Sequence, residues 1–220
     1  MFKHITQIVL IVLIGTASSL LFAKATPKIP NVIKATAMVT KDSLAGWKTV
    51  NPKFQSLWSL VDGVITGGDG QTKIKHNTFL CTEKEYGNFE FRSLFKLSGV
   101  KGTGLINSGI QYRTVLKEGK LAGYQADIGN KYWGDIYDEH RRGLLVKGNL
   151  TILKDILKRD GWNSYIIRCI GNHHELYING VKTVDYYEKD DVPHKGVIGI
   201  QLHSGGKAKI EFKHVTITEL

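Results

Sequence analysis

Short runs of β-branched and aromatic residues, each ended by glycine, asparagine or aspartate, constrain the fold of this 220-residue chain more than any other feature. Typical runs are FEFRSLFKL at 89–97, SGIQYRT at 108–114 and GYQADIG at 123–129. Runs of this length between turn residues predict β-strands. VDGV and INGV supply residues that tolerate positive φ in hairpin turns. The sequence therefore predicts an all-β antiparallel sandwich from about Lys41 onward. TILKDILKRDGW, residues 151–162, is better suited to a helical turn or loop.

The first 25 residues have the pattern of a secretory signal peptide. A short basic start precedes an uncharged apolar run from Ile5 to Ala23, and Ala23, Lys24 and Ala25 form a small-x-small cleavage triplet. We expect export to the periplasm or the medium, with residues 26–40 as a linker or N-terminal arm and residues 41–220 as one domain. An uncleaved anchor is the alternative, because the run approaches the roughly 18 residues that span a bilayer. A membrane contact is expected only in that case.

The formal charge of +10 raises the question of a nucleic-acid partner. The lysines and arginines are scattered singly and form no run of five or more, so we expect no nucleic-acid binding. Cys81 and Cys169 are the two cysteines, and at most one bridge could join them. Two buried free thiols are favoured over that bridge, and neither cysteine has ligands at the spacing of a zinc site.

Strand alternation gives the predicted strands a core face and a polar face. Ile110 and Tyr112, for example, are expected in the core. The residues assigned to the other face are Gln111, Arg113, Gln125, Asp127, Gln201 and His203, with Glu90 as an extension of the same face. A solvated surface is the alternative. Amide, guanidinium, carboxylate and imidazole groups have fixed hydrogen-bonding geometry suited to polyhydroxylated ligands, which favours a binding site.

The ordered set of motifs between residues 42 and 220 resembles a family of exported 3-keto-disaccharide hydrolase-like domains. The stretches that carry the resemblance are DSLAGWKTV, LWSLVDGVITG, FLCTEKEYGNFEFRSLFKL, NSGIQYRT, GYQADIGNKYWGDIYDEHRRGLL, DGWNSYIIRCIGNHHELYINGVKTVDY and GVIGIQLHSGGKAKIEFKHVTITEL. The resemblance implies a concanavalin-like jelly roll, a β-sandwich of two antiparallel sheets. It also implies action on glycosides already oxidised at carbon 3.

Glucanases of this fold carry two glutamates on one strand, a nucleophile and an acid. Here the corresponding strand reads GYQADIG, with Gln125 where the first glutamate is expected. A glutamine can neither form a glycosyl ester nor act as an acid. Direct double displacement on an unmodified glucan is therefore disfavoured, although a pair built from other carboxylates is left open.

The chemistry implied by the resemblance starts at carbon 2, where the neighbouring ketone acidifies the proton. It needs a base, a partner for the enolate and a donor near the leaving group. We expect Asp127 and His203 to be base and acid, in either order, and Arg113 to bind the enolate oxygen. Sugar hydroxyls are assigned to the amides of Gln111, Gln125 and Gln201. A divalent metal ion could replace the arginine, but no calcium-loop motif is present, so the metal stays undecided.

NKYWGDIYDEHRRG, residues 130–143, is interpreted as a loop that forms one wall of the pocket. Trp133, Tyr137 and Arg141 are its expected ligand contacts, because flat aromatic faces stack on sugar rings. The roles of its other charged residues are left open. We expect an enzyme that cleaves 3-keto-glycosides. A non-catalytic lectin-like module and a structural domain without sugar affinity are the alternatives.

Overall fold

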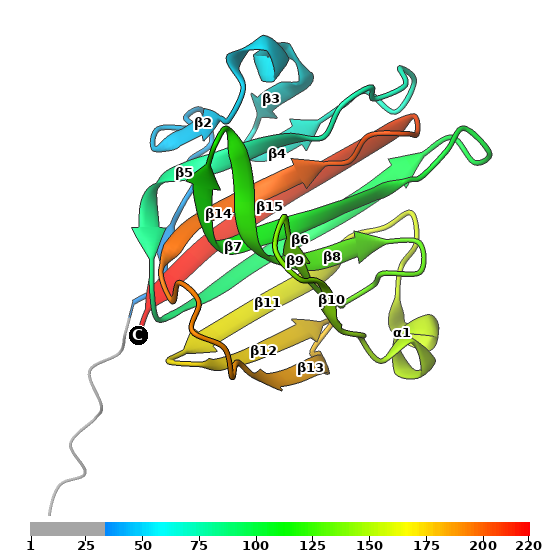
Figure 1. Cartoon of the computed structure of the whole chain (residues 1–220). Helices are drawn as coiled ribbons and strands as arrows, with labels where there is room; N and C mark the ends of the chain where they lie inside the picture. Colours follow the sequence, from blue (N-terminus) through cyan, green and yellow to red (C-terminus); the bar gives the residue numbers. More distant parts are fainter. Residues whose placement is uncertain (1–33) are drawn as a thin grey trace, which may run out of the picture. The chain divides into compact units, whose positions relative to one another are not determined.

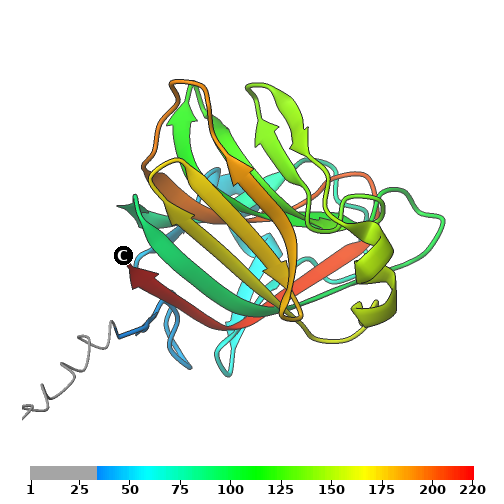
Figure 2. The same ribbon diagram turned by 90° about the horizontal axis from the view of Figure 1, so that it is seen from below.

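The computed structural model describes residues 34–220; the predicted signal peptide and residues 26–33 of the predicted arm lie outside the described residues. Two antiparallel sheets pack face to face, as Figures 1 and 2 show from two directions. The predicted all-β sandwich of two antiparallel sheets is confirmed. Among the described residues, no helix is long and apolar enough to cross a membrane.

The eight-stranded sheet contains both ends of the described chain. In spatial order its strands are β13 (Val181–Tyr187), β12 (His173–Ile178), β11 (Asn163–Ile170), β6 (Phe89–Gly99), β15 (Ala208–Glu219), β4 (Val64–Gly67) and β3 (Trp58–Val61), while β1 (Thr36–Ala37) pairs with β15 off this path. The described part of the predicted N-terminal arm therefore runs along β15.

The seven-stranded sheet carries most of the polar residues singled out by the sequence. Its strands, in spatial order, are β10 (Gly143–Val146), β9 (Ile136–Glu139), β8 (Lys120–Gly129), β7 (Asn107–Lys117), β14 (Gly196–Leu202), β5 (Thr78–Tyr86) and β2 (Trp47–Thr49). Two short helices complete the chain, the 3-10 helix η1 (Pro52–Leu57) and α1 (Leu150–Ile156). Helix α1 overlaps residues 151–162, for which a helical turn or loop was predicted, and the Asn149 side chain accepts a hydrogen bond from Ile152 N at its start.

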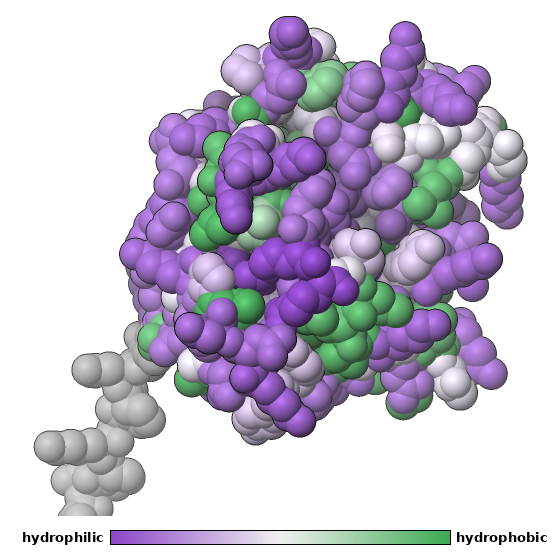
Figure 3. Space-filling view, in the orientation of Figure 1, coloured by the Kyte–Doolittle hydropathy of each residue, from purple (hydrophilic) through white to green (hydrophobic). Residues whose placement is uncertain are grey.

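The core lies between the sheets and follows the period-two alternation of the strands. In β6, Phe89, Phe91 and Phe95 have no exposed surface, whereas Arg92 between them is exposed. Ile110 and Tyr112 on β7 face them from the seven-stranded sheet, as predicted. Outside, the molecule is mostly hydrophilic on the face shown in Figure 3, with apolar side chains in separate areas. Cys81 and Cys169 are both buried and free, on β5 and β11.

Two central strands are buried on both faces, which an ordinary solvated sheet would not show. Almost every residue of β7 and β8 is buried, including the polar ones. Gln111, Gln125 and Asp127 retain at most 3% of their exposed surface. Other parts of the chain therefore cover the polar face of these two strands. Polar side chains on this face are held in fixed positions, as a binding site requires.

The predicted wall loop at residues 130–143 is partly wrong. Residues 130–135 do form a turn, but Ile136–Glu139 is strand β9, hydrogen-bonded to β8 on one side and to β10 on the other. The alternation is present, with Ile136 and Asp138 buried and Tyr137 and Glu139 on the other face. A carboxylate at a buried position broke the apolar pattern on which the sequence prediction depended.

Candidate functional site

A pocket of about 220 Å³ opens on the covered polar face of the seven-stranded sheet. Side chains from β7, β8, β9 and β14 line it together with side chains from four connecting segments. Its lining residues are Asn77, Leu105, Asn107, Gln125, Asp127, Tyr132, Tyr137, Glu139, Gln201 and His203. Amides, carboxylates, one imidazole and two phenol rings thus converge on one small volume, the composition of a polar ligand site.

Asp127 is fixed by a chain of hydrogen bonds that runs across β8 and β7. Gln125 Nε2 donates to Asp127 Oδ1 at 2.6 Å, and Gln111 Nε2 donates to Gln125 Oε1 at 2.7 Å. Thr114 Oγ1 completes the chain with a bond to Gln111 Oε1 at 3.0 Å. The Oδ2 atom of Asp127 is left as the oxygen that can carry a proton toward a ligand.

Gly109 makes room for this arrangement. Gly109 is on β7, where it pairs with Asp127 of β8 on one side and with Gln201 of β14 on the other. A Cβ atom at this position would come within 2.5 Å of Gln125 Cγ. The missing side chain lets Gln125 lie across the strand and reach both of its partners.

Burial raises the pKa of Asp127 to about 8, and the carboxylates of Asp135 and Glu139 add to the effect, while the Gln125 hydrogen bond opposes it. Asp127 is therefore mostly protonated at neutral pH. Burial also raises the pKa of Glu139, although the imidazoles of His140 and His203 counteract this. Groups with shifted pKa values in a cleft are typical of sites that move protons.

His203 is held in one tautomer by its neighbour. Its Nδ1 lies 2.6 Å from the carbonyl oxygen of Ser204, which can only accept, so Nδ1 carries the hydrogen. Nε2 of the neutral ring is then an acceptor. Ser204 N in turn donates to Asn77 Oδ1 at 2.8 Å, which fixes this part of the rim.

Two amide oxygens of the lining are buried without a hydrogen-bond partner among the described residues. They are Oδ1 of Asn107 and Oε1 of Gln201. Such atoms are rare in folded proteins, because an unmade hydrogen bond costs about 1–3 kcal/mol. Ligand hydroxyl groups would satisfy both.

The structure brings five of the predicted site residues together in the pocket. They are Gln125, Asp127, Tyr137, Gln201 and His203. Gln111, also predicted, lies one hydrogen bond behind them and contacts Gln125. Their roles toward a ligand stay predictions, but their common location is a feature of the fold.

Arg113 was predicted on this polar face, and its placement there is wrong. The residue has a positive φ of 46° within a bulge of the β7 and β8 pairing, so the alternation reverses. Its guanidinium is fully buried and donates to the carbonyl oxygens of Gly87 and Gly171 at 2.9 and 2.6 Å. Arg113 thus joins the β5–β6 connection to the β11–β12 turn and does not line the pocket.

Glu90 and Trp133, also predicted as ligand contacts, lie elsewhere. Glu90 is on β6 of the other sheet, where it pairs with Arg92 and Arg168, because that strand belongs to the opposite layer. Trp133 is 7% exposed and packs on Phe95 in the core, so its ring does not face the pocket. The sequence pattern does not indicate which of the two sheets contains β6, or that the Trp133 ring points into the core.

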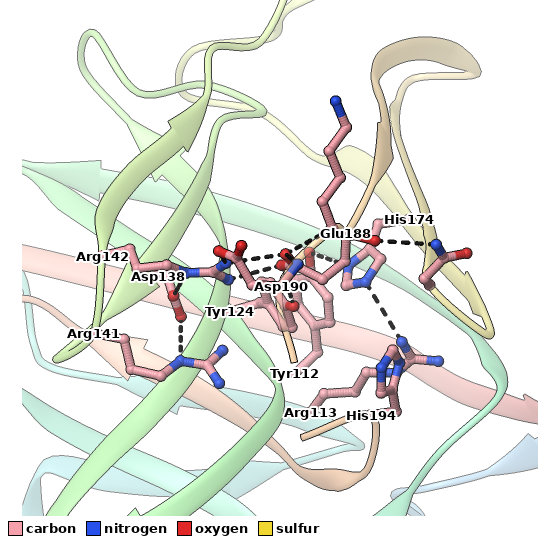
Figure 4. Close-up of polar contacts among 12 residues, drawn as sticks. Tyr112, Arg113, Tyr124, Asp138, Arg141, Arg142, His174, Glu188, Asp190 and His194 are labelled. Carbon is pink, nitrogen blue, oxygen red and sulfur yellow. Dashed lines mark hydrogen bonds and ion pairs between the residues drawn. The ribbon is translucent and has the colours of Figure 1, made fainter. Parts of the chain in front are cut away.

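Arg141, the fourth misplaced residue, is part of a network that Figure 4 shows and that we call the Glu188 cluster: Tyr124, Asp138, Arg141, Arg142 and Glu188. Arg141 and Arg142 each donate from Nε to one oxygen of Asp138 at 2.6 Å. Arg142 also bonds both oxygens of Glu188, whose Oε2 accepts from the Tyr124 hydroxyl at 2.6 Å. Although burial raises the pKa of Glu188, the bonds from Arg142 and Tyr124 hold it below its ordinary value.

The Glu188 cluster anchors β9 from the side opposite the pocket. Asp138 has no exposed surface and lies between Tyr137 and Glu139, which both line the pocket. Because side chains alternate along a strand, holding Asp138 inward holds its two neighbours toward the ligand volume. The two arginines therefore act on the pocket through the backbone of β9.

Sequence reasoning missed five lining residues: Asn77, Leu105, Asn107, Tyr132 and Glu139. Glu139 could have been found from its period-two relation to Tyr137, had β9 been recognised. The others lie on connecting segments or at a strand start, where no periodic signal marks the direction of a side chain.

The described residues contain one group of three side chains spaced for a metal ion, His173, Glu175 and Asp185. It lies on the eight-stranded sheet, away from the pocket. The ammonium of Lys182 already contacts Glu175 Oε1 and Asp185 Oδ2 at 2.7 Å each. A resident cation side chain thus neutralises this group.

Comparison with known proteins agrees with the fold and shows the family. The sequence profile described as "3-keto-alpha-glucoside-1,2-lyase-like domain" matches residues 34–218. A search of curated proteins finds no match to the chain. Among solved structures, a "putative glycosyl hydrolase" from Parabacteroides distasonis is similar with a TM-score of 0.61 and 21% identity, over 84% of this chain and 94% of that one.

Two Bacillus subtilis structures share the fold. The carbohydrate-binding module CBM66 has a TM-score of 0.59 and 17% identity over 84% of this chain and 99% of its own. A protein of unknown function with a galectin-like fold has a TM-score of 0.61 and 9% identity over 85% and 95%. The predicted concanavalin-like jelly roll is thereby confirmed. Because its profile spans residues 34–218, the chain belongs to the family of 3-keto-alpha-glucoside-1,2-lyase-like domains.

Proposed function

We propose that this domain cleaves glycosides oxidised at carbon 3 of the sugar, by proton abstraction at carbon 2 and β-elimination of the aglycone. One observation carries the proposal: a protonated buried carboxyl, Asp127, and an imidazole with a free Nε2, His203, line the same small pocket. Family membership supports the class of substrate. Elimination needs no carboxylate nucleophile, which fits the glutamine at position 125.

The protonated carboxyl group of Asp127 and the tautomer of His203 assign the acid and the base to different residues. His203 removes the carbon 2 proton through Nε2, because its Nδ1 is committed to the Ser204 carbonyl oxygen. Glu139 stabilises the imidazolium that forms. Asp127 gives its proton to the leaving oxygen. The C2–H and C1–O bonds break, the C1=C2 double bond forms, and the aglycone leaves as the alcohol.

Water that later adds across the C1=C2 bond completes a net hydrolysis without any redox change. Asn107 and Gln201 would accept hydrogen bonds from sugar hydroxyls through their unpartnered oxygens. The proposed location is outside the cytoplasm, following the signal peptide predicted in residues 1–25.

The test is a time course on a 3-keto-disaccharide, with products identified by mass so that the enolone is seen. The protein is expected to release the aglycone and, in heavy water, to exchange the carbon 2 hydrogen. The unoxidised disaccharide is the control substrate. Asp127→Asn and His203→Gln should each lower kcat by roughly 10²–10⁴, the range of general acid–base catalysis. Asp155→Asn, on exposed α1, should not.

A non-catalytic carbohydrate-binding module is the second candidate, favoured by the shared fold with the Bacillus subtilis module. Under that reading the same variants weaken sugar binding and no turnover occurs. Release of the aglycone no faster than in buffer, with and without divalent metal ions, together with sugar binding that these variants weaken, would therefore decide for binding alone.

A further inference from the structure

A second cavity of about 500 Å³ adjoins the pocket, and the Asn77 side chain lines both. We call it the basic groove. Four of its lining residues are basic or imidazole groups, Lys75, His76, Lys120 and His140, and no carboxylate is among its described lining residues. The pocket next to it contains two carboxyl groups. The two cavities thus adjoin at Asn77 and differ in charge.

Several distant segments build the basic groove. The start of β8 supplies Lys120, the segment before β5 supplies Lys75 and His76, and the β9–β10 turn supplies His140. Nδ1 of His140 donates to the Leu121 carbonyl oxygen at 2.8 Å, which ties that turn to β8. Glu139 lies at the border, 3.7 Å from His140, but its side chain belongs to the pocket.

The floor of the groove suits a ring with one flat apolar face. Phe79 and Leu121 are nearly buried there, and Phe54 and His76 form a ring pair with centroids 5.7 Å apart. Apolar surface beneath and cationic groups at the rim match a sugar ring that bears an anionic substituent. The cavity volume lies within the roughly 300–1,000 Å³ of ordinary ligand sites.

We propose that the basic groove binds an anionic group, a uronate carboxylate or a sulfate ester, on the sugar unit next to the one in the pocket. Lys75 and Lys120 supply the charge at its rim, and His76 and His140 supply ring donors. As a substrate subsite the groove rests on the proposed function. As a binding site for anionic sugars it does not.

Calorimetric titration of the full chain with three disaccharides tests this. They share one backbone and carry a uronate, a sulfate ester or no charge on the terminal unit. Both anionic ligands, or one of them, should bind more tightly than the neutral one, and the difference should shrink when salt rises from about 0.05 M to about 0.5 M. The stronger ligand identifies the source of the anion.

The double variant Lys75→Gln/Lys120→Gln is expected to weaken binding of the anionic disaccharide by roughly 3- to 10-fold, the sum of two exposed ion pairs. It should leave the neutral ligand unchanged. The matched control is Lys154→Gln/Lys195→Gln, which removes equal charge from α1 and from the segment before β14. Equal affinity for neutral and anionic ligands, no binding of either anion, or an equal loss in the control would overturn the proposal.

Binding and turnover fail separately. If anionic disaccharides are preferred and Asp127→Asn keeps that preference, the groove stands even where no 3-keto-glycoside is cleaved. If cleavage occurs with no preference for charge, the proposed function stands and the groove does not.

Discussion

Gly109 determines the shape of the pocket more directly than any charged residue. Gln125 is hydrogen-bonded at both ends of its amide and lies over the backbone of Gly109. It cannot move aside without breaking a bond to Gln111 or Asp127. Because Gly109 has no side chain, Gln125 has room to hold the carboxyl group of Asp127, which we propose as catalytic, in its present direction.

Gly109→Ala is expected to displace Gln125, because the new Cβ would lie 2.5 Å from Cγ and 2.6 Å from Cδ. We expect kcat on a 3-keto-glycoside to fall by about 10²-fold or more, since small misplacements of this size are costly in catalysis. Gly87→Ala is the matched control, because its nearest neighbour is 3.9 Å away. Full activity in Gly109→Ala would show that the Gln125 bond to Asp127 is not needed.

The direction of the Arg113 side chain could not be predicted from the sequence. The alternation that correctly placed Gln111 fails two residues later, because a bulge with positive φ follows Tyr112. Nothing in SGIQYRT announces that bulge. Gln125 and Asp127 lie on an unbroken part of β8 and were placed correctly for that reason.

At the scale of elements, strand prediction depended on apolar alternation and turn residues. This was sufficient for β6, β7, β8 and β14, whose core faces are mainly apolar or aromatic. It failed for β9, where Asp138 occupies a buried position and is neutralised by Arg141 and Arg142. The partners that make this burial possible lie three and four residues away, and Arg142 meets Glu188 only through the fold.

Arg142→Gln is expected to loosen β9 and β10. The substitution removes ion pairs to Asp138 and Glu188, both nearly buried, and should lower the free energy of unfolding by about 3–5 kcal/mol. Amide hydrogen exchange should rise most in Ile136–Val146. Because Tyr137 and Glu139 are carried by β9, kcat should fall as well.

Arg159→Gln serves as the comparison for that variant, since Arg159 is exposed and lies outside the Glu188 cluster. Exchange that rises uniformly across all strands would contradict a specific anchor. It would mean that the Glu188 cluster stabilises the sandwich as a whole.

For the whole molecule, Asp127 and His174 are two buried groups whose pKa values shift in opposite directions. Burial and the Arg113 guanidinium lower the pKa of His174 to about 3 from an ordinary 6.5. The unfolded chain therefore binds more protons at His174 between pH 3 and 6.5, and stability from this residue is lost as pH falls through that range. Asp127 acts in the reverse sense. Its folded pKa of about 8 exceeds the ordinary 3.8, so its stabilisation is lost as pH rises from 3.8 to 8.

The two contributions oppose each other between pH 3.8 and 6.5 and separate above it. From pH 6.5 to 8 the contribution of Asp127 is no longer opposed by that of His174, and it should lower the free energy of unfolding by about 2 kcal/mol, at about 1.4 kcal/mol per pH unit. Urea denaturation at a series of pH values measures this. Asp127→Asn should abolish the fall, because an amide has no proton to lose. His174→Gln should extend the fall down to pH 3.8, because the cancelling slope is gone. A wild-type slope retained in Asp127→Asn would place the titrating group elsewhere in the chain and would remove the protonated acid from the proposed mechanism.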